Sequence, residues 1–212
     1  MARREDLPRK IDSMIIRPLT VFEREAVRAF YLALSADDRR KRFCCSLSDA
    51  TISGYVDGLN FTRDTILGAY DERAQIIGLA ELVRSQKAGE MAFSVRPDKR
   101  GQKIGTLLME RLVSRARMCG ANKVFVMFLS DNTPMRRMAL RAGMSVQTVD
   151  GESHAERELS PASAQELIRL LFEEGLAHSG YFSTLGMAQL GSLAERSASA
   201  TRKRVNALVP TV

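Results

Sequence analysis

Cationic side chains gather around one glycine turn near the middle of the 212-residue chain. Between Arg96 and Arg117, seven lysines and arginines stand against only Asp98 and Glu110. A strand end that runs through Gly101 into a helix would turn several backbone N–H groups toward one point, and the helix N-terminus adds roughly half a positive charge. The pattern therefore predicts a turn that binds an anion such as a phosphate.

The spacing of this turn excludes two common nucleotide-binding loops. A Walker loop needs one more residue between its glycines than separates Gly101 from Gly105, and it needs a lysine directly after the second glycine. A dinucleotide-binding fold needs an acidic residue at a strand end about 20 positions further on. The chain has the apolar run Val124–Leu129 in that region. We therefore expect a phosphate-bearing ligand of another class.

The composition excludes several other classes of protein. Apolar residues make up 45% of the chain and charged residues 27%, as in soluble globular proteins. With three cysteines, two histidines and no CxxC pair, the sequence predicts no disulfide framework, no metal site and no histidine-assisted nucleophile. No apolar run approaches the ~18 residues of a membrane span, and the N-terminus lacks a secretory signal, so we expect a cytoplasmic protein without a membrane partner.

Hydrophobic periodicity predicts a mixed α/β domain around the turn. The predicted strands are Met14–Leu19, Thr65–Tyr70, Gln75–Val83, Glu90–Arg96, Val124–Leu129 and Met144–Val149. The predicted helices are Val21–Leu34, Ser48–Leu59, one from the glycine turn to Gly120, and one from a Thr133 cap and Pro134 to Gly143. Ser35–Asp38 is predicted as a break before the basic run Arg39–Arg42.

Composition changes near Ser160, where we expect the α/β domain (residues 14–160) to end. Residues 161–178 have apolar side chains at helical spacing, and residues 196–204 are rich in serine, alanine and basic residues. We therefore predict a C-terminal helical extension and a mobile basic tail over residues 161–212. The helix is expected to pack on the domain, to cover a substrate groove or to form a homodimer contact.

The segment Val95–Met144 resembles the acetyl-CoA-binding core of the GNAT superfamily of N-acetyltransferases. The pyrophosphate loop of that family reads [QR]-x-x-G-x-[GA], and Arg100–Gly105 matches it except at Lys103. The apolar strand before Asn132 is also similar, and Leu32–Phe43 resembles a stretch of bacterial protein-lysine-acetyltransferase-like members. The resemblance covers residues 14–160 and implies a GNAT-like mixed, mostly antiparallel sheet flanked by helices.

The resemblance also implies the cosubstrate and the residues that hold it. Acetyl-CoA would be the acetyl donor, with the backbone of Phe93 and Val95 holding its pantetheine arm and thioester. The implied contacts with the rest of the cofactor are Arg100, Gly101, Gln102, Lys103, Ile104, Gly105, Thr106 and Asn132. Because Lys103 lies where the helix begins, we expect it to have a negative φ angle and to keep its N–H donor.

Acetylation of an amine requires a group that removes the proton of the ammonium ion. Glu90 is the first candidate, because it lies ten residues before Arg100, where several protein-acetylating members carry a glutamate. Its alternative role is that of a surface residue at a strand end. Glu81, within an apolar stretch of the preceding strand, is the second candidate. Many members carry a tyrosine at the position of Ala139 as general acid, so water is expected to serve here.

Two classes of function follow from the resemblance. The first is an acetyltransferase acting on a protein lysine, a protein N-terminus or a small-molecule amine. The second is a catalytically inactive acyl-CoA-binding sensor or interaction module. Nucleic-acid binding through Arg39–Arg42 is not favoured, since the basic residues lack interleaved aromatic side chains and the chain has no tryptophan. The same basic run could attract an acidic substrate surface, although a solvated helix face is the simpler interpretation.

Overall fold

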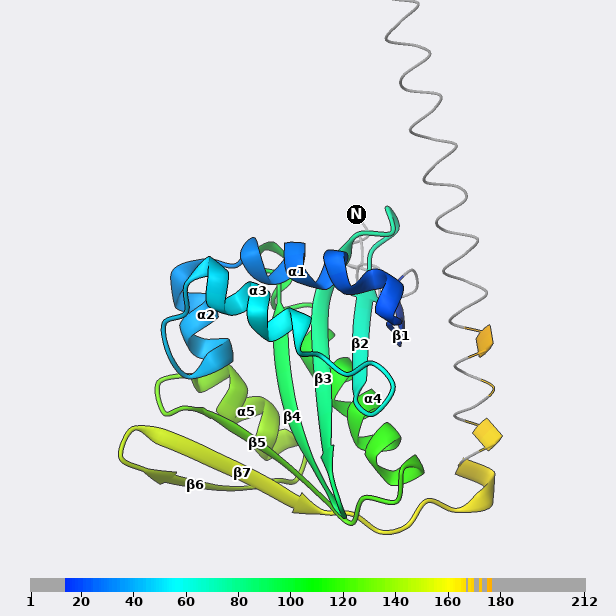
Figure 1. Cartoon of the computed structure of the whole chain (residues 1–212). Coiled ribbons are helices and arrows are strands. Elements are labelled where there is room, and N and C mark those ends of the chain that lie inside the picture. Colours follow the sequence, from blue (N-terminus) through cyan, green and yellow to red (C-terminus); the bar gives the residue numbers. More distant parts are fainter. Residues whose placement is uncertain (1–13, 167, 170–171, 173–174, 177–212) are drawn as a thin grey trace, which may run out of the picture.

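The computed structural model describes residues 14–166, 168–169, 172 and 175–176. A seven-stranded sheet forms the centre of the molecule, with helices on both of its faces (Figure 1). The described residues between 164 and 176 are helical, as the sequence predicts. The rest of the predicted extension, including the basic segment 196–204, lies outside the described residues.

The strands are arranged in the order β1-β2-β3-β4-β5-β7-β6. Every neighbouring pair is antiparallel except β4 and β5, which are parallel. The bounds are Ile15–Pro18 (β1), Thr65–Tyr70 (β2), Ile76–Ser85 (β3), Ala88–Val95 (β4), Lys123–Leu129 (β5), Ser145–Val149 (β6) and Glu152–Glu158 (β7). The predicted mixed, mostly antiparallel sheet is therefore confirmed.

Strands β4 and β5 separate soon after they begin. Their register joins residues 88–90 of β4 to residues 123–125 of β5 and goes no further. Figure 1 shows the two strands diverging from this short paired segment. The second half of β4 is thus paired with β3 on one side and faces a gap on the other.

Helices cover the two faces of the sheet unequally. The helical segments are η1 (Val21–Glu23), α1 (Arg24–Leu32), α2 (Ala36–Phe43), α3 (Asp49–Asp57), η2 (Pro97–Lys99), α4 (Ile104–Met118) and α5 (Thr133–Arg141). One core lies between α1, α3 and strands β2 and β3, and includes Val27, Ile52 and Leu79. A second core lies under α4 and α5 on the opposite face, and includes Leu108, Val126 and Ala139.

Two elements differ from the sequence-based expectation. The segment expected as a break and a basic run is helix α2, capped by Ser35, whose Oγ accepts from the N–H of Asp38. Acidic residues occupy its first turn and basic residues its last, which favours a helix electrostatically although the apolar periodicity is weak. The N-cap of α5 is Asn132, one residue before the predicted cap Thr133.

The second difference is strand β7, which the sequence analysis does not predict. It forms a hairpin with β6 through Asp150-Gly151, both of which have positive φ angles (49° and 85°), as a tight hairpin turn requires. Its inward residues are the small Ser153 and Ala155, and its other residues are charged or polar. A strand with one solvent-facing side and small inward residues leaves a weak hydrophobic signal.

A buried ion pair connects the helical layer to the sheet. Arg42 at the end of α2 contacts Glu81 of β3, with 3.0 Å between Nη2 and Oε2. The hydroxyls of Tyr31 and Tyr55 donate to the two oxygens of the same carboxylate. The Arg42 guanidinium also lies 4.7 Å from the ring centre of Phe43. Burial raises the pKa of Tyr31, so its hydroxyl stays protonated as a donor.

These contacts join α1, α2 and α3 to the centre of the sheet through one carboxylate. Replacing one partner of a buried ion pair leaves the other charge buried and uncompensated. We therefore predict that Glu81→Gln lowers the free energy of unfolding by about 3 kcal/mol, measured by urea denaturation. The double variant Glu81→Met/Arg42→Met should recover part of this loss, because it buries no charge but leaves the Tyr31 and Tyr55 hydroxyls without their acceptor.

Glu110→Gln, on the exposed side of α4, is the matched control and should leave the unfolding midpoint unchanged. Equal midpoints for Glu81→Gln and this control would show that the ion pair does not hold the helices to the sheet.

Candidate active site

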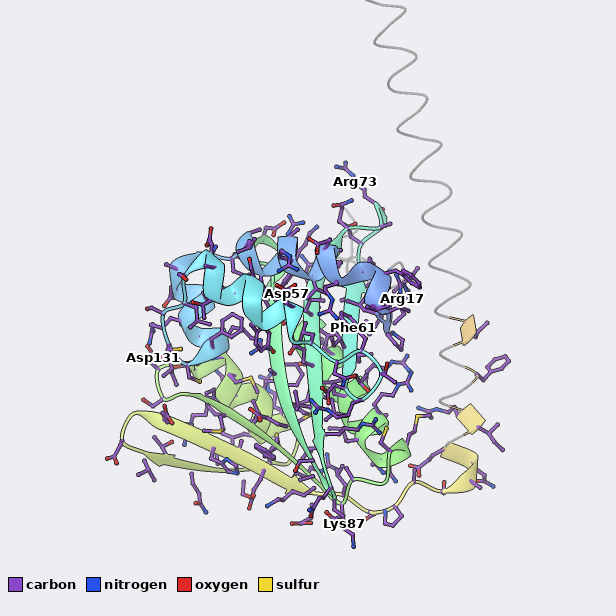
Figure 2. All side chains as sticks on the ribbon, viewed as in Figure 1. Arg17, Asp57, Phe61, Arg73, Lys87 and Asp131 are labelled. Atoms are coloured by element: carbon purple, nitrogen blue, oxygen red, sulfur yellow. The ribbon has the colours of Figure 1, made fainter. Side chains whose placement is uncertain are left out.

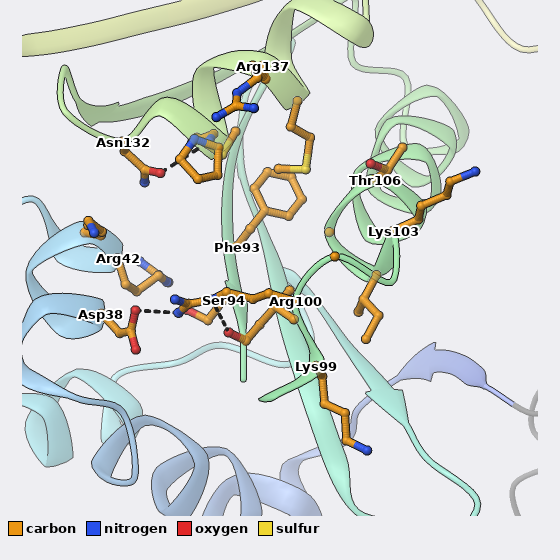
Figure 3. A pocket seen from close by; sticks show the side chains of 18 of the residues that line it. Asp38, Arg42, Phe93, Ser94, Lys99, Arg100, Lys103, Thr106, Asn132 and Arg137 are labelled. Atoms are coloured by element: carbon orange, nitrogen blue, oxygen red, sulfur yellow. Dashed lines mark hydrogen bonds and ion pairs between the residues drawn. The ribbon is translucent and has the colours of Figure 1, made fainter. Parts of the chain in front are cut away.

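A cavity of about 510 Å³ lies where the gap between β4 and β5 meets the glycine turn. Its walls come from α2, the end of β4, the turn before α4, and α5 (Figure 3). All the residues assigned to the cofactor from the sequence line it except Gln102: Phe93, Val95, Arg100, Gly101, Lys103, Ile104, Gly105, Thr106 and Asn132. Segments nearly 40 residues apart in the sequence thus meet at one site.

The cavity is strongly cationic. Its lining includes Lys41, Arg42, Lys99, Arg100, Lys103, Arg137 and Arg141, against Asp38 alone among acidic residues. The first turn of α4 borders the cavity, and the backbone N–H groups at a helix start have no partner within the helix. Positive side chains and unpaired N–H donors at one wall suit a ligand that carries several phosphates.

Lys103 has a left-handed backbone, contrary to our expectation. Its φ angle is +60°, and that of Gly101 is +77°. The chain must turn sharply back between β4 and α4, and it does so through these two residues immediately before the helix. Lys103 stands at the N-cap position with this geometry, which costs a residue with a Cβ roughly 1–2 kcal/mol. The lysine keeps its backbone N–H at the turn, but at the expense of strain.

Gly105 allows α4 and α5 to approach each other. A Cβ atom built at Gly105 would lie 3.1 Å from the Sδ atom of Met138, which also lines the cavity. Such a contact is tighter than most real Cβ contacts, so a side chain here would force Met138 to shift. The bare backbone of Gly105 thus lets Met138 pack against the first turn of α4.

Asp38 orients the first residue of the glycine turn. Its carboxylate accepts from Nη2 of Arg100, and Nε of Arg100 donates to the carbonyl oxygen of Val95 at 3.3 Å (Figure 3). Asp38 is buried, and its own Oδ2 lies 2.8 Å from Oγ of Ser35. Asp38 was not among the residues predicted for the site, although it falls within the stretch Leu32–Phe43 that carries part of the resemblance.

Ser94 presents an unpartnered hydroxyl to the cavity. The residue is 8% exposed, and its Oγ has no hydrogen-bond partner among the described residues. The sheet register puts Ser94 opposite Leu79 and Ala92 opposite Glu81, so Ser94, Ala92 and Glu90 share the face covered by the first helices. The sequence predicted this shared face from strand alternation alone.

The two candidate carboxylates have different surroundings. Glu90 is exposed, lies at the last paired residue before β4 and β5 separate, and has no ion-pair or hydrogen-bond partner in the described part of the chain. Glu81 is buried and bonded to Arg42, Tyr31 and Tyr55. Neither borders the cavity directly. Glu90 is four residues from Ser94, a strand distance of about 13 Å.

Asn132, which caps α5, and Ala139 within α5 lie in different surroundings. Asn132 borders the cavity, and its Oδ1 accepts from the N–H of Met135 at 3.2 Å, which caps the helix. Ala139 is completely buried in the core beneath α5. No hydroxyl is available at position 139, and a tyrosine there would need room that the packed core does not provide.

Comparisons with known proteins agree with this architecture. Residues 19–144 match the family model of the Acetyltransferase (GNAT) family. The GNAT domain of PAT from S. lividans is 23% identical, with a TM-score of 0.59, over 68% of this chain and 89% of that domain. A GNAT-family acetyltransferase from Streptococcus pneumoniae is 12% identical, with a TM-score of 0.56, over 69% and 99% of the two chains. Ribosomal-protein-alanine N-acetyltransferase from Brucella melitensis is 17% identical, with a TM-score of 0.55, over 68% and 99%.

Among the described residues, no helix combines the length and apolar character needed to cross a bilayer. The described residues also contain no group of three or more histidine, cysteine, aspartate or glutamate side chains arranged to hold a metal ion.

The left-handed backbone at position 103 leads to a test of the turn. We predict that Lys103→Gly raises the free energy of unfolding by about 1 kcal/mol, because glycine adopts a positive φ angle without strain. Gly101→Ala is the converse variant. A Cβ there would meet no atom within 4 Å, so any loss of stability reports the backbone alone. Urea denaturation measures both, and a destabilised Lys103→Gly would contradict the strained geometry.

Proposed function

Because the chain belongs to the GNAT family of acetyltransferases, we propose that it transfers the acetyl group of acetyl-CoA to a primary amine by direct attack, with Glu90 as general base acting through water. The amine is a protein lysine, a protein N-terminus or a small-molecule amine. The observation that carries this proposal is the cationic cavity where the gap between β4 and β5 meets the glycine turn.

The cavity residues suit the chemistry of coenzyme A. The N–H groups from Gly101 to Thr106 would bind its pyrophosphate, and the surrounding lysines and arginines would neutralise its phosphates. The part of β4 from Met91 to Val95 has no strand beside it on the β5 side, so its outward backbone groups need other partners. Backbone groups of Phe93 and Val95 would hold the pantetheine arm there. When bound, the cofactor supplies the acetyl thioester that the amine attacks.

Glu90 is placed to take up a proton at the point where the gap between β4 and β5 begins. Its carboxylate is exposed and has no partner in the described part of the chain, so it is available to accept a proton. The intervening Ala92 is small, which leaves space along the strand face toward Ser94. Because about 13 Å of strand separates Glu90 from Ser94, the proton would travel through ordered water rather than directly. The Ser94 hydroxyl can donate to or accept from such water.

Glu81 takes a positioning role in this proposal. Three donors already occupy its two oxygens, so removing a substrate proton would require that the ion pair with Arg42 be broken. Arg42 lines the cavity, and Glu81 therefore fixes one wall of the site through it. With alanine at position 139, the departing thiolate would receive its proton from water.

A comparison of three variants tests the roles of the carboxylates. Glu90→Gln should lower kcat by about 10²-fold or more and leave the KM for acetyl-CoA unchanged, because it removes a general base and no cofactor contact. Glu81→Gln should mainly lower the free energy of unfolding. Its kcat, measured at a temperature where the variant remains folded, should fall less than that of Glu90→Gln. Glu110→Gln is the control and should behave as the wild type.

Coenzyme A release is measured with three acceptors: a lysine peptide with a blocked N-terminus, a lysine-free peptide with a free N-terminus, and a polyamine. Turnover of any one of them supports the proposal. Tight binding of acetyl-CoA without turnover of any amine would contradict it and indicate a binding module. Normal kcat in Glu90→Gln would exclude Glu90 as the base.

A further inference from the structure

One half of the sheet has a face that the described helices leave largely uncovered. On this side α1 and α3 lie over β2 and β3 and α2 contacts β4 and β5, whereas most of β5, β7 and β6 remains open (Figure 1). The register assigns to the face Glu90 of β4 with Lys123, Phe125, Met127 and Leu129 of β5, Glu152, His154, Glu156 and Glu158 of β7, and Ser145, Gln147 and Val149 of β6. We call this set the open face.

The open face carries a charge opposite to that of the whole protein. Four glutamates and one lysine give it a formal charge of −3 with His154 neutral, whereas the chain as a whole has +7. Lys123 is 3.0 Å from Glu156, so that ammonium is already paired with a carboxylate of the face. Glu152 and Glu158 are exposed, and their carboxylates form no hydrogen bond or ion pair among the described residues. The charged residues that line the cavity beside the face, by contrast, are all cationic except Asp38.

Apolar surface lies between these charges. Met127 is 49% exposed and Val149 is 68% exposed. The ring of Phe125 stacks on that of His154, with 5.4 Å between their centres. Aliphatic stems of lysine and arginine side chains can lie on such a surface while their charged ends reach carboxylates.

The basic run on α2 does not offer a competing cationic surface. Arg39 pairs with Asp49, Lys41 with Asp37, and Arg42 with Glu81. Arg40 pairs with Asp37 and, at 2.6 Å, with Asp131, which Figure 2 marks in the loop after β5. Internal carboxylates thus neutralise the run, and the suggestion that it attracts an acidic substrate loses its support.

The open face leads directly to the proposed base. Glu90 lies opposite Phe125 on the same face, at the point where the gap begins. Cys44 follows α2 at the border of the face, where burial raises the pKa of its thiol and the charges of Glu152 and Glu90 raise it further. Carboxylates of β7 and of β4 therefore both act on the thiol of Cys44.

We propose that the amine acceptor is a lysine within a basic, extended protein segment that docks on the open face. The target lysine would enter the gap beside Glu90, and neighbouring lysines or arginines would contact Glu152, Glu156 and Glu158. Opposite charge across the surface favours such a segment and disfavours an acidic one. This inference rests on the proposed function and assigns the class of its acceptor.

Three blocked peptides that share one central lysine test the proposal, with arginine, serine or glutamate at the flanking positions. The arginine-flanked peptide should have a kcat/KM about tenfold above that of the serine-flanked peptide at low salt, and the ratio should fall as salt rises. In the double variant Glu152→Gln/Glu158→Gln the same ratio should fall about tenfold, because two exposed carboxylates are neutralised. Glu110→Gln is the control for the ratio.

Binding of a fluorescent arginine-flanked peptide to the full chain separates this proposal from the proposed function. Peptide binding that weakens in the double variant supports the docking surface, whether or not turnover is detected. Turnover of all three peptides at equal rates, or a flanking preference that the double variant retains, would overturn it. Turnover of the polyamine alone would leave the acetyltransferase standing and reject a protein acceptor.

Discussion

The short pairing of β4 with β5 is the constraint on which the rest of the site depends. Parallel strands normally continue side by side, and each residue adds hydrogen bonds. Here the register stops at Glu90 and Phe125, so the remainder of β4 keeps unpaired backbone groups toward the gap. Those groups are too costly to leave without partners, and one of them, the Val95 carbonyl, already accepts from Arg100. A ligand with amide groups would satisfy the others.

Packing on both sides keeps this gap open. On one side, the buried Arg42–Glu81 pair and the two tyrosine hydroxyls hold α2 against β3. On the other side, Gly105 lets Met138 of α5 approach the first turn of α4. Asp38 of α2 joins the two sides, because its carboxylate accepts a hydrogen bond from Arg100 of the turn. The walls of the cavity are therefore fixed by contacts between elements far apart in the sequence.

Positive and negative side chains lie on different sides of the gap, so the two sides of the site favour ligands of opposite charge. The net charge of the chain predicts affinity for anions but cannot distinguish between its two surfaces. Cations line the cavity, whereas glutamates line the open face beside it. An anionic cofactor and a cationic acceptor would thus approach the gap from different sides. The local distribution of charged side chains, and not the net charge of the chain, distinguishes the two surfaces.

The sequence by itself determined the order of most elements, the glycine turn, and the shared face of Glu90, Ala92 and Ser94. These features depend on local periodicity and on turn chemistry, which a chain displays before it folds. Tertiary structure decided that β7 pairs between β5 and β6, and it stabilises the charged segment 36–43 as a helix although its apolar periodicity is weak. It also decided that Lys103 is left-handed and that Glu81 is bound by Arg42. Such outcomes depend on partners supplied by distant segments, since a polar helix or strand gains its stability from what it packs against.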